Sequence, residues 1–476
     1  MSVHVSATLR CNMGCDYCYE EPGRQYDQAQ IDSEYDIEAI MGRLKQFKQR
    51  YPGQTPGLHG GEPLLMRDEH IERILKWTHE EYDLEEQKKN THIQTNGTLI
   101  TDEHIEMFEK YRVNVGISCD GPGDLNGLRY ARSEMDGEQR DITDSMTEKT
   151  LNSIERVADS DASMGIIVVL TKQNAGDDEK LENLLSWMDS LQERGVSGHF
   201  NPAIPYEDVQ ADESLTPTRL KEVYLRTWEW MKAEPYRNWG PMNDMQDNLI
   251  GNSLRNCVEN KCDVFNAGAA KIATGDGNTT GCGKTWGTVG DGAAFLQGDS
   301  NGSEYNNTEE RYEMLKQVPG PHTEGEEDHG GCKGCQFWNV CQGGCPSSGL
   351  DYDYRNRTRW CEAKYAVLDA IKHDMKAMMT GMRMITDAPW DAPIADLAAS
   401  GQLDIKPFAG MHQSQVSRDA TKPSVSGARH DENSVLSQSL QNADFDTKRD
   451  AYIEKYGEEN VTADPETGSI HGDISH

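Results

Sequence analysis

The sequence predicts an α/β fold in which a parallel sheet of strand–helix units is followed by a smaller cysteine-rich domain. Six segments with strand patterns alternate with segments of helical periodicity between residues 1 and 240. Eight cysteines then fall between positions 257 and 361, in a stretch rich in Gly, Asn and Asp. Because parallel strands need crossover connections, the alternation indicates right-handed βαβ units in one sheet.

The first strand pattern, Val3-His4-Val5-Ser6-Ala7, leads directly into a loop that carries Cys11, Cys15 and Cys18. Three thiolates at C-x3-C-x2-C spacing can hold one face of a four-iron cluster and leave the fourth iron open. An open metal position can bind a substrate or a cofactor. A zinc site or three incidental cysteines is the alternative, but a structural zinc site needs a fourth ligand close by.

Helices and strands alternate after this loop. Ser33 and Asp36 resemble a capping box, and apolar residues at helical spacing follow them, so a helix is expected over 34–50. A short strand should lead into His59, and a helix with Ile71, Ile74, Leu75 and Trp77 on one side should come next. The later elements are expected as strand 91–95, helix 102–111, strand 113–118, helix 144–159, strand 164–170, helix 178–193 and strand 196–200.

Two further helices are expected beyond the six strands. Thr216 and Pro217 form an N-cap with proline at the first helical position, which predicts a helix to about 233. Residues 235–248 are expected to be a connector. A helix with apolar residues at helical spacing should begin after Cys361 and end near 383.

Polar and glycine-rich motifs follow the second, third and fourth strands. They are His59-Gly60-Gly61-Glu62-Pro63, Thr95-Asn96-Gly97 and Ser118-Cys119-Asp120-Gly121-Pro122. Because parallel strands end at the same edge of a sheet, these motifs and the cysteine loop should lie together. Glycines at such positions let the backbone approach a ligand closely.

The cysteine loop has the form C-x3-C-x-aromatic-C, with Tyr17 as the aromatic residue, and with the three later motifs it resembles the radical S-adenosylmethionine (SAM) enzymes. The resemblance implies an open, partial (βα)6 TIM-like barrel over residues 1–240. It implies that a [4Fe-4S] cluster on Cys11, Cys15 and Cys18 binds SAM and cleaves it reductively to a 5′-deoxyadenosyl radical, which takes a hydrogen atom from the substrate.

The same resemblance implies a set of residues that contact SAM. Arg129 or Arg132 could pair with the SAM carboxylate, since arginine offers a forked match to carboxylates, although an exposed surface arginine is the alternative for each. Asn201 could touch SAM or substrate. The SAM contacts are expected from Tyr17, Gly60, Gly61, Glu62, Asn96, Ser118, Asp120 and Arg129.

The second group of cysteines resembles the SPASM extension of radical SAM enzymes, which closes two auxiliary [4Fe-4S] clusters. It is expected as a domain over 250–383, with a hairpin around residues 274–278. The resemblance implies one cluster on Cys257, Cys262, Cys282 and Cys345, and another on Cys332, Cys335, Cys341 and Cys361. Fully ligated clusters would serve electron transfer or architecture. A zinc ribbon on the cysteines from 332 to 345 is the alternative.

The remaining composition limits the partners. Asp and Glu number 81 against 47 Lys and Arg, a formal charge of −34, which argues against nucleic acid and anionic membranes as partners. The sequence shows neither a membrane-spanning run nor a signal peptide, so a cytoplasmic protein is expected. Residues 384–476 form a polar, acidic extension that should be largely disordered, with a short helix possible near 446–456.

Relatives with both modules mostly modify peptides or proteins, so oxidative modification of a peptide or protein side chain is the leading hypothesis, with a ferredoxin or flavodoxin as electron donor. A basic leader peptide would suit the acidic surface. Sulfatase-maturating enzymes place an Asp after the cysteine that is Cys282 here. This chain has Gly283 instead, which argues against formylglycine formation, although Asp276 lies close in sequence. The alternatives are radical modification of a small-molecule cofactor precursor and a non-catalytic iron–sulfur electron carrier.

Overall fold

The computed structural model describes residues 2–21, 35–50, 52–132, 145–205, 213–251, 269–272, 279–280, 308–353, 355–386, 461–464 and 469–472. The chain divides into two units, Met1–Val416 and Ser417–His476. In the second unit, β10 (Val461–Asp464) and β11 (Ser469–Gly472) form an antiparallel pair. The helix considered near 446–456 lies outside the described residues.

The first unit is organised around one sheet, in which nine strands are described, in the order β7-β6-β5-β4-β3-β2-β1-β8-β9. The six predicted strands are confirmed, and a short seventh, β7, extends their parallel arrangement. The bounds are β1 Ser2–Ser6, β2 Pro56–His59, β3 Thr91–Thr95, β4 Val113–Ser118, β5 Ser163–Leu170, β6 Ser197–Pro202 and β7 Trp239–Gly240.

The predicted hairpin is present at the other edge. Strand β8 (Ala269–Ile272) runs parallel to β1, and β9 (Thr279–Thr280) returns antiparallel to β8. The cysteine-rich region therefore adds two strands to the sheet of the predicted barrel. Among the described strands β7 and β9 form separate edges, so the sheet is open, as expected for a partial barrel.

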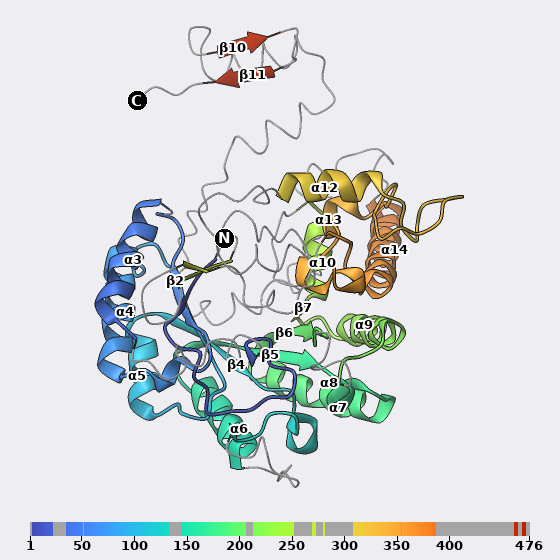
Figure 1. Cartoon of the computed structure of the whole chain (residues 1–476). Coiled ribbons are helices and arrows are strands. Elements are labelled where there is room, and N and C mark those ends of the chain that lie inside the picture. Colours follow the sequence, from blue (N-terminus) through green and yellow to red (C-terminus); the bar gives the residue numbers. More distant parts are fainter. Residues whose placement is uncertain are drawn as a thin grey trace. The chain divides into compact units, whose positions relative to one another are not determined.

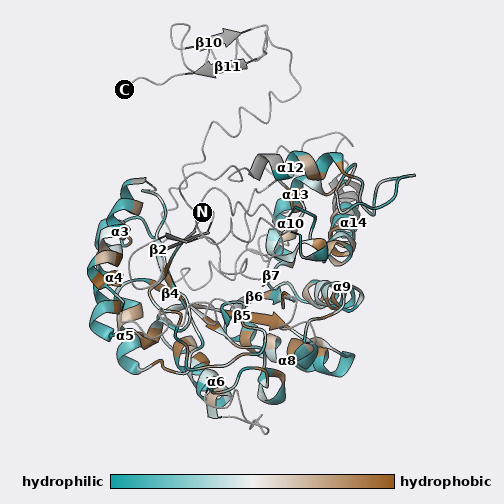
Figure 2. Ribbon diagram, in the orientation of Figure 1, coloured by the Kyte–Doolittle hydropathy of each residue, from teal (hydrophilic) through white to brown (hydrophobic). Residues whose placement is uncertain are grey.

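Helices cover one face of this sheet (Figure 1). Val5, Leu58, Ile93 and Val115 lie in one row across β1 to β4 and are at most 1% exposed, as part of the hydrophobic core on this face. In Figure 2 the brown, hydrophobic colour is clearest on β5. The covering helices are α3 (Ile37–Arg50), α4 (Asp68–Glu81), α5 (Asp102–Lys110), α6 (Ser145–Ala158), α7 (Lys172–Ala175) and α8 (Asp178–Glu193).

The opposite face of the sheet, called the inner face below, is polar. It carries His4 and His92 in one transverse row, with Gly57 between them in the register. A Cβ on Gly57 would lie 2.0 Å from Nε2 of His92, so the absence of a side chain there makes room for the imidazole. The His4 ring lies 4.9 Å from that of His59 and 5.6 Å from that of His92, between centroids. Hydrogen-bonding groups therefore gather inside the curve of the strands.

Two expectations about the element bounds were wrong. Helix α3 begins at Ile37 and not at 34, because the Asp36 carboxylate accepts hydrogen bonds from the amides of Glu38 and Ala39 (2.9 and 3.0 Å) and acts as the cap. The expected connector 235–248 contains β7 and most of helix α10 (Met242–Leu249), since buried Trp239 and Met242 anchor it to the core.

The cysteine-rich region packs on the barrel through two helices. Helix α9 (Pro217–Ala233) is capped by Thr216 as predicted, and α14 (Cys361–Thr386) follows the last cysteine as predicted. The Asp374 carboxylate on α14 accepts hydrogen bonds from Trp228 and Lys232 on α9, each 2.8 Å long. Two short helices precede α14, namely α12 (Thr308–Gln317) and α13 (Trp338–Cys341).

Short 3-10 turns complete the described helical structure. Their bounds are Pro63–Leu65, Gly123–Asn126, Pro346–Ser348 and Leu350–Tyr352. Of the helices that the structure describes, none combines the length and the apolar character needed to cross a bilayer.

Candidate active site

The loop with Cys11, Cys15 and Cys18 follows β1 and is fixed against residues 128–132, which come after β4. One side-chain contact joins the two segments, because the Tyr130 hydroxyl donates a hydrogen bond to the Asp16 carboxylate (2.8 Å). Three backbone hydrogen bonds join the segments, from the amides of Gly14, Asp16 and Arg132 to the carbonyls of Tyr130, Leu128 and Asn12, at 3.0, 3.1 and 2.9 Å. These hydrogen bonds therefore hold the cysteine loop in place at the C-terminal edge of the sheet.

The three thiols influence one another. None is in a disulfide, and all three are partly exposed. Burial raises the pKa of the Cys15 thiol to about 12, the Arg129 guanidinium opposes this, and the neighbouring thiols of Cys18 and Cys11 raise it further. Thiolates gathered in this way need positive charge between them, and iron supplies it. The donor set thus fits a cluster ligated by three cysteines.

The glycine motif after β2 runs against the start of this loop. The amides of Gly61 and Glu62 donate to the carbonyls of Thr8 and Arg10, at 3.0 and 2.8 Å. A Cβ on Gly61 would lie 2.1 Å from the Arg10 carbonyl oxygen, and Gly60 has a φ of +117°, which disfavours other residues. Both glycines are therefore required for the backbone of the motif to reach the cysteine loop.

The Glu62 side chain is fully buried and joins the ends of β2 and β3. Its carboxylate accepts hydrogen bonds from the Leu64 amide (3.0 Å), the Thr95 hydroxyl (2.8 Å) and the Asn96 amide (2.7 Å). Burial raises the pKa of Glu62, while these three donors oppose that shift. The carboxylate is thus a positioning group, and the expected contact of Glu62 with SAM would come from its backbone.

We expect Glu62→Gln to destabilise the protein by about 1–3 kcal/mol, because the new amide group would face donors where a carboxylate accepts. Denaturant unfolding under anaerobic conditions measures this change. Glu106→Gln is the control, since Glu106 is exposed on α5. Equal stability of the two variants would contradict the positioning role.

Asn96 connects the third motif to the cysteine loop. Its side-chain nitrogen donates to the Asn12 side-chain oxygen (2.8 Å) and lies 3.8 Å from the Cys11 sulfur. Its side-chain oxygen accepts from the Thr98 amide (2.9 Å). The Asn96 side chain therefore fixes the first cysteine of the loop.

Tyr17, Asp120 and Arg129 form a buried hydrogen-bonded network. The Tyr17 hydroxyl donates to the Asp120 carboxylate and accepts from Nη1 of Arg129 (2.7 Å). The other Asp120 oxygen accepts from the Val169 amide on β5 (2.8 Å). Burial raises the pKa of Tyr17 and that of Asp120. The network links the cysteine loop to β4 and β5.

The two arginines have different environments. Arg129 is 6% exposed, and its Nε has no acceptor among the described residues, so one buried donor remains for a ligand such as a carboxylate. Arg132 pairs through both terminal nitrogens with Glu21 (3.1 and 3.0 Å), which leaves it less suited to hold a ligand. Arg129 is therefore a better candidate than Arg132 for binding the carboxylate of a ligand.

Ser118 lies on the inner face at the end of β4, where its hydroxyl accepts from the Gln94 side chain (2.8 Å). The register places Ser118, Ile167, His199 and Gly240 in one row across four strands. His199 is thus about 10 Å from Ser118, since neighbouring strands are about 4.8 Å apart. Asn201, for which a SAM or substrate contact was expected, follows on the same face of β6.

His199 has a carboxylate partner. Its Nε2 lies 3.5 Å from Asp244 on α10, and the two side chains are 25% and 20% exposed. A Cβ on Gly240 would lie 2.1 Å from the His199 ring, so the imidazole rests on glycine backbone. An imidazole beside a carboxylate can accept a proton from a substrate and return it during a reaction. Nothing in the sequence motifs indicated this pair.

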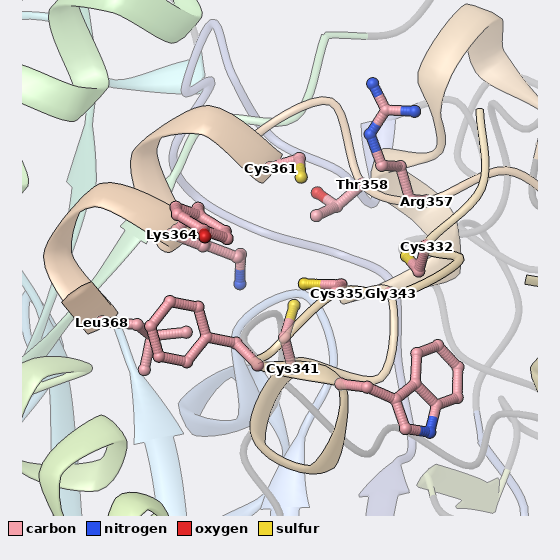
Figure 3. A pocket seen from close by; sticks show the side chains of 12 residues that line it. Cys332, Cys335, Cys341, Gly343, Arg357, Thr358, Cys361, Lys364 and Leu368 are labelled. Atoms are coloured by element: carbon pink, nitrogen blue, oxygen red, sulfur yellow. The ribbon is translucent and has the colours of Figure 1, made fainter. Parts of the chain in front are cut away.

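Four of the predicted auxiliary-cluster ligands surround one pocket (Figure 3). Burial raises the pKa of the Cys361 thiol to about 12, and it also raises the pKa of Cys332 and of Cys335. The neighbouring thiol of Cys341 raises the pKa of Cys361 and that of Cys332 further. The four cysteines that line the pocket, called the four-thiol pocket below, are Cys332, Cys335, Cys341 and Cys361.

The other predicted auxiliary ligands are not part of this pocket. Cys345 is 3% exposed, and its sulfur lies 2.9 Å from the Ser347 hydroxyl. It does not line the four-thiol pocket. Cys257, Cys262 and Cys282 lie outside the described residues, so the assignment of these four cysteines to one cluster stays a prediction.

The arrangement of the cysteines can be compared with what a zinc site would require. In the part of the chain that the structure describes, no three His, Cys, Asp or Glu side chains converge as ligands of a single metal ion. Cys332, Cys335, Cys341 and Cys361 surround one pocket, an arrangement that would suit a cluster of several metal atoms. A zinc ribbon would also combine Cys345 with Cys332 and Cys335, whereas Cys361 takes that place in the pocket.

Comparison with known proteins agrees with this geometry. Residues 5–185 match the model of the radical SAM superfamily. A 207-residue match to an uncharacterized protein of Methanothermobacter thermautotrophicus has 28% identity and covers 43% of this chain and 69% of that protein. A match to the cysteine-type anaerobic sulfatase-maturating enzyme of Clostridium perfringens has 29% identity over 26% of this chain and 33% of that enzyme.

The fold extends the similarity beyond the matched sequence. The solved structure described as native anSMEcpe with bound AdoMet and Cp18Cys peptide superposes with a TM-score of 0.59 at 16% identity. The superposition covers 80% of this chain and 99% of that one. The cysteine-rich region is thus included in the shared fold. The cysteine loop and the motifs at the ends of β2, β3 and β4 all lie within residues 5–185, the part of this chain that is similar to the radical SAM superfamily.

Proposed function

We propose that this chain is a radical SAM oxidoreductase that modifies a side chain of a peptide or protein, with an auxiliary iron–sulfur cluster as electron acceptor. The four-thiol pocket carries the proposal, because an enzyme that only cleaved SAM would need no second set of buried thiols. Bound at the three-cysteine loop, SAM and a [4Fe-4S] cluster would supply a carbon-centred radical that takes a hydrogen atom from the substrate.

The chain's own residues would position these groups. Cys11, Cys15 and Cys18 would hold the cluster, while the backbone of the Gly60-Gly61-Glu62 segment would meet the SAM amino group. The free Nε of Arg129 offers a buried donor for the SAM carboxylate. Asn96, Ser118, Asp120 and Tyr17 would shape the same site, directly or through the hydrogen bonds described above.

An oxidation also requires an acceptor for one electron and one for a proton. After hydrogen abstraction, a carbon next to an S–H, O–H or N–H group can form a double bond to that atom if it loses one electron and that proton. An oxidised cluster in the four-thiol pocket would take the electron. His199 on the inner face, whose Nε2 lies 3.5 Å from Asp244, would take the proton.

Support for a peptide substrate comes from the fold of anSMEcpe, which has been solved with a bound peptide. The formal charge of −34 favours a basic peptide segment as substrate. A small electron donor, such as a ferredoxin or a flavodoxin, is also part of the proposal. Radical modification of a small-molecule cofactor precursor is the second candidate, because the polar inner face would also suit a compact polar substrate.

Anaerobic reconstitution tests the proposal. The protein is loaded with iron and sulfide and incubated with SAM, dithionite and synthetic basic peptides that carry deuterium on the side chain of one cysteine or serine. Release of 5′-deoxyadenosine excludes a plain electron carrier, and deuterium in that product identifies a peptide as the hydrogen donor. 5′-Deoxyadenosine without deuterium from any peptide, but with deuterium from a labelled cofactor precursor, would favour the second candidate.

A further inference from the structure

Lys364 lies in an unusual place for a lysine. It is 2% exposed, on the first turn of α14, one turn after Cys361. It lines the four-thiol pocket, and Figure 3 shows its amino group directed toward the sulfur atoms of Cys335 and Cys341. Lysine is among the residues least often fully buried, because its charge is costly to remove from water without compensation.

Arg357 is a second buried cation at the same pocket. It is 7% exposed, and its terminal nitrogens donate to the two oxygens of Asp328 at 2.7 and 2.6 Å. The guanidinium acts against the burial that raises the pKa of Cys361. The Asp328 carboxylate compensates much of the positive charge of Arg357.

Thiolates around a buried cluster give this region a strong negative charge, and reduction of the cluster adds one more electron. A cation held nearby in a medium of low dielectric constant stabilises the reduced form more than the oxidised form. Net charge and hydrogen bonds to sulfur are among the factors that set cluster potentials.

We propose that Lys364, assisted by Arg357, raises the reduction potential of the cluster held in the four-thiol pocket, so that this cluster accepts an electron from the substrate. The inference rests on the proposed function for the presence of the cluster. It adds a role for two side chains that neither ligate iron nor contact SAM. The electron is the one that leaves the substrate radical together with the proton described above.

The test compares Lys364→Met with Lys376→Met in the full-length reconstituted protein. Both variants remove one positive charge from α14, but Lys376 is exposed to solvent. A redox titration followed by electron paramagnetic resonance gives the potential of each cluster. We expect Lys364→Met to lower the ratio of reduced to oxidised cluster about tenfold at a fixed potential for one auxiliary cluster, a shift of about 59 mV for a one-electron couple. Lys376→Met should leave this ratio unchanged.

Two further variants separate the possible outcomes. Lys364→Arg should keep a potential close to that of the wild type, because it keeps the charge. If Lys364→Met yields too little folded protein, Lys364→Gln replaces it in the same titration. A potential that does not change in the variant without the charge would overturn the inference. Iron absent from the pocket in the wild-type protein would instead refute the proposed function.

Discussion

Changing Cys15 to Ala abolishes the reductive cleavage of SAM, with 5′-deoxyadenosine falling to the level of a reaction without enzyme. Cys15 is the central thiol of the loop, and its loss leaves two ligands where the cluster needs three. Chromatographic measurement of 5′-deoxyadenosine after anaerobic incubation with SAM and dithionite gives the result directly.

Cys119→Ala is the matched control for this change. Cys119 is the one cysteine to which no cluster is assigned, and it is fully buried with its thiol directed to the Gly121 carbonyl (3.5 Å). Its loss should reduce stability slightly and preserve SAM cleavage. Cleavage that survives in Cys15→Ala, or that disappears equally in both variants, would remove the assignment of the first cluster.

Changing Cys335 to Ala lowers the iron content by about four atoms per chain while SAM cleavage continues. The reason is that Cys335 belongs to the four-thiol pocket and not to the cysteine loop. Iron and sulfide analysis, with zinc measured in the same samples, gives the change. Unchanged iron, or zinc present in its place, would contradict an auxiliary cluster in this pocket.

A second cysteine variant tests which ligands belong together. Cys345 does not line the four-thiol pocket, so Cys345→Ala should remove a different cluster. The double variant Cys335→Ala/Cys345→Ala should therefore lose about eight iron atoms, twice the loss of either single variant. A double variant that loses no more iron than Cys335→Ala would place both cysteines on one cluster.

The strands and most helices could be predicted from the sequence, because their apolar periodicity is local. The same holds for the placement of the motifs at strand ends, which follows from the parallel order of the strands. The start of α3 was predicted too early because Ser33 also resembled a cap, whereas Asp36 accepts the hydrogen bonds. Local patterns offer several candidate caps, and the contacts decide between them.

The partners of the site residues could not be predicted in this way. The Glu62 carboxylate bonds to the Asn96 amide 34 positions later, and Tyr17 bonds to Asp120 across 103 positions. An arginine such as Arg129 is usually exposed, and only the fold shows that it is buried. The His199–Asp244 pair depends on the short strand β7, which the sequence pattern did not indicate.

Helix α14 begins with a cysteine of the four-thiol pocket and bonds through Asp374 to the barrel helix α9. Cys361 and Asp374 stand 13 positions apart in this continuous helix, which separates them by about 20 Å along the helix axis. Helix α14 and the hydrogen bonds of Asp374 therefore hold the four-thiol pocket at a fixed distance from the strands. An auxiliary cluster in the four-thiol pocket would therefore have its distance from the strands set when the chain folds, and its electron transfer would depend on that fixed distance.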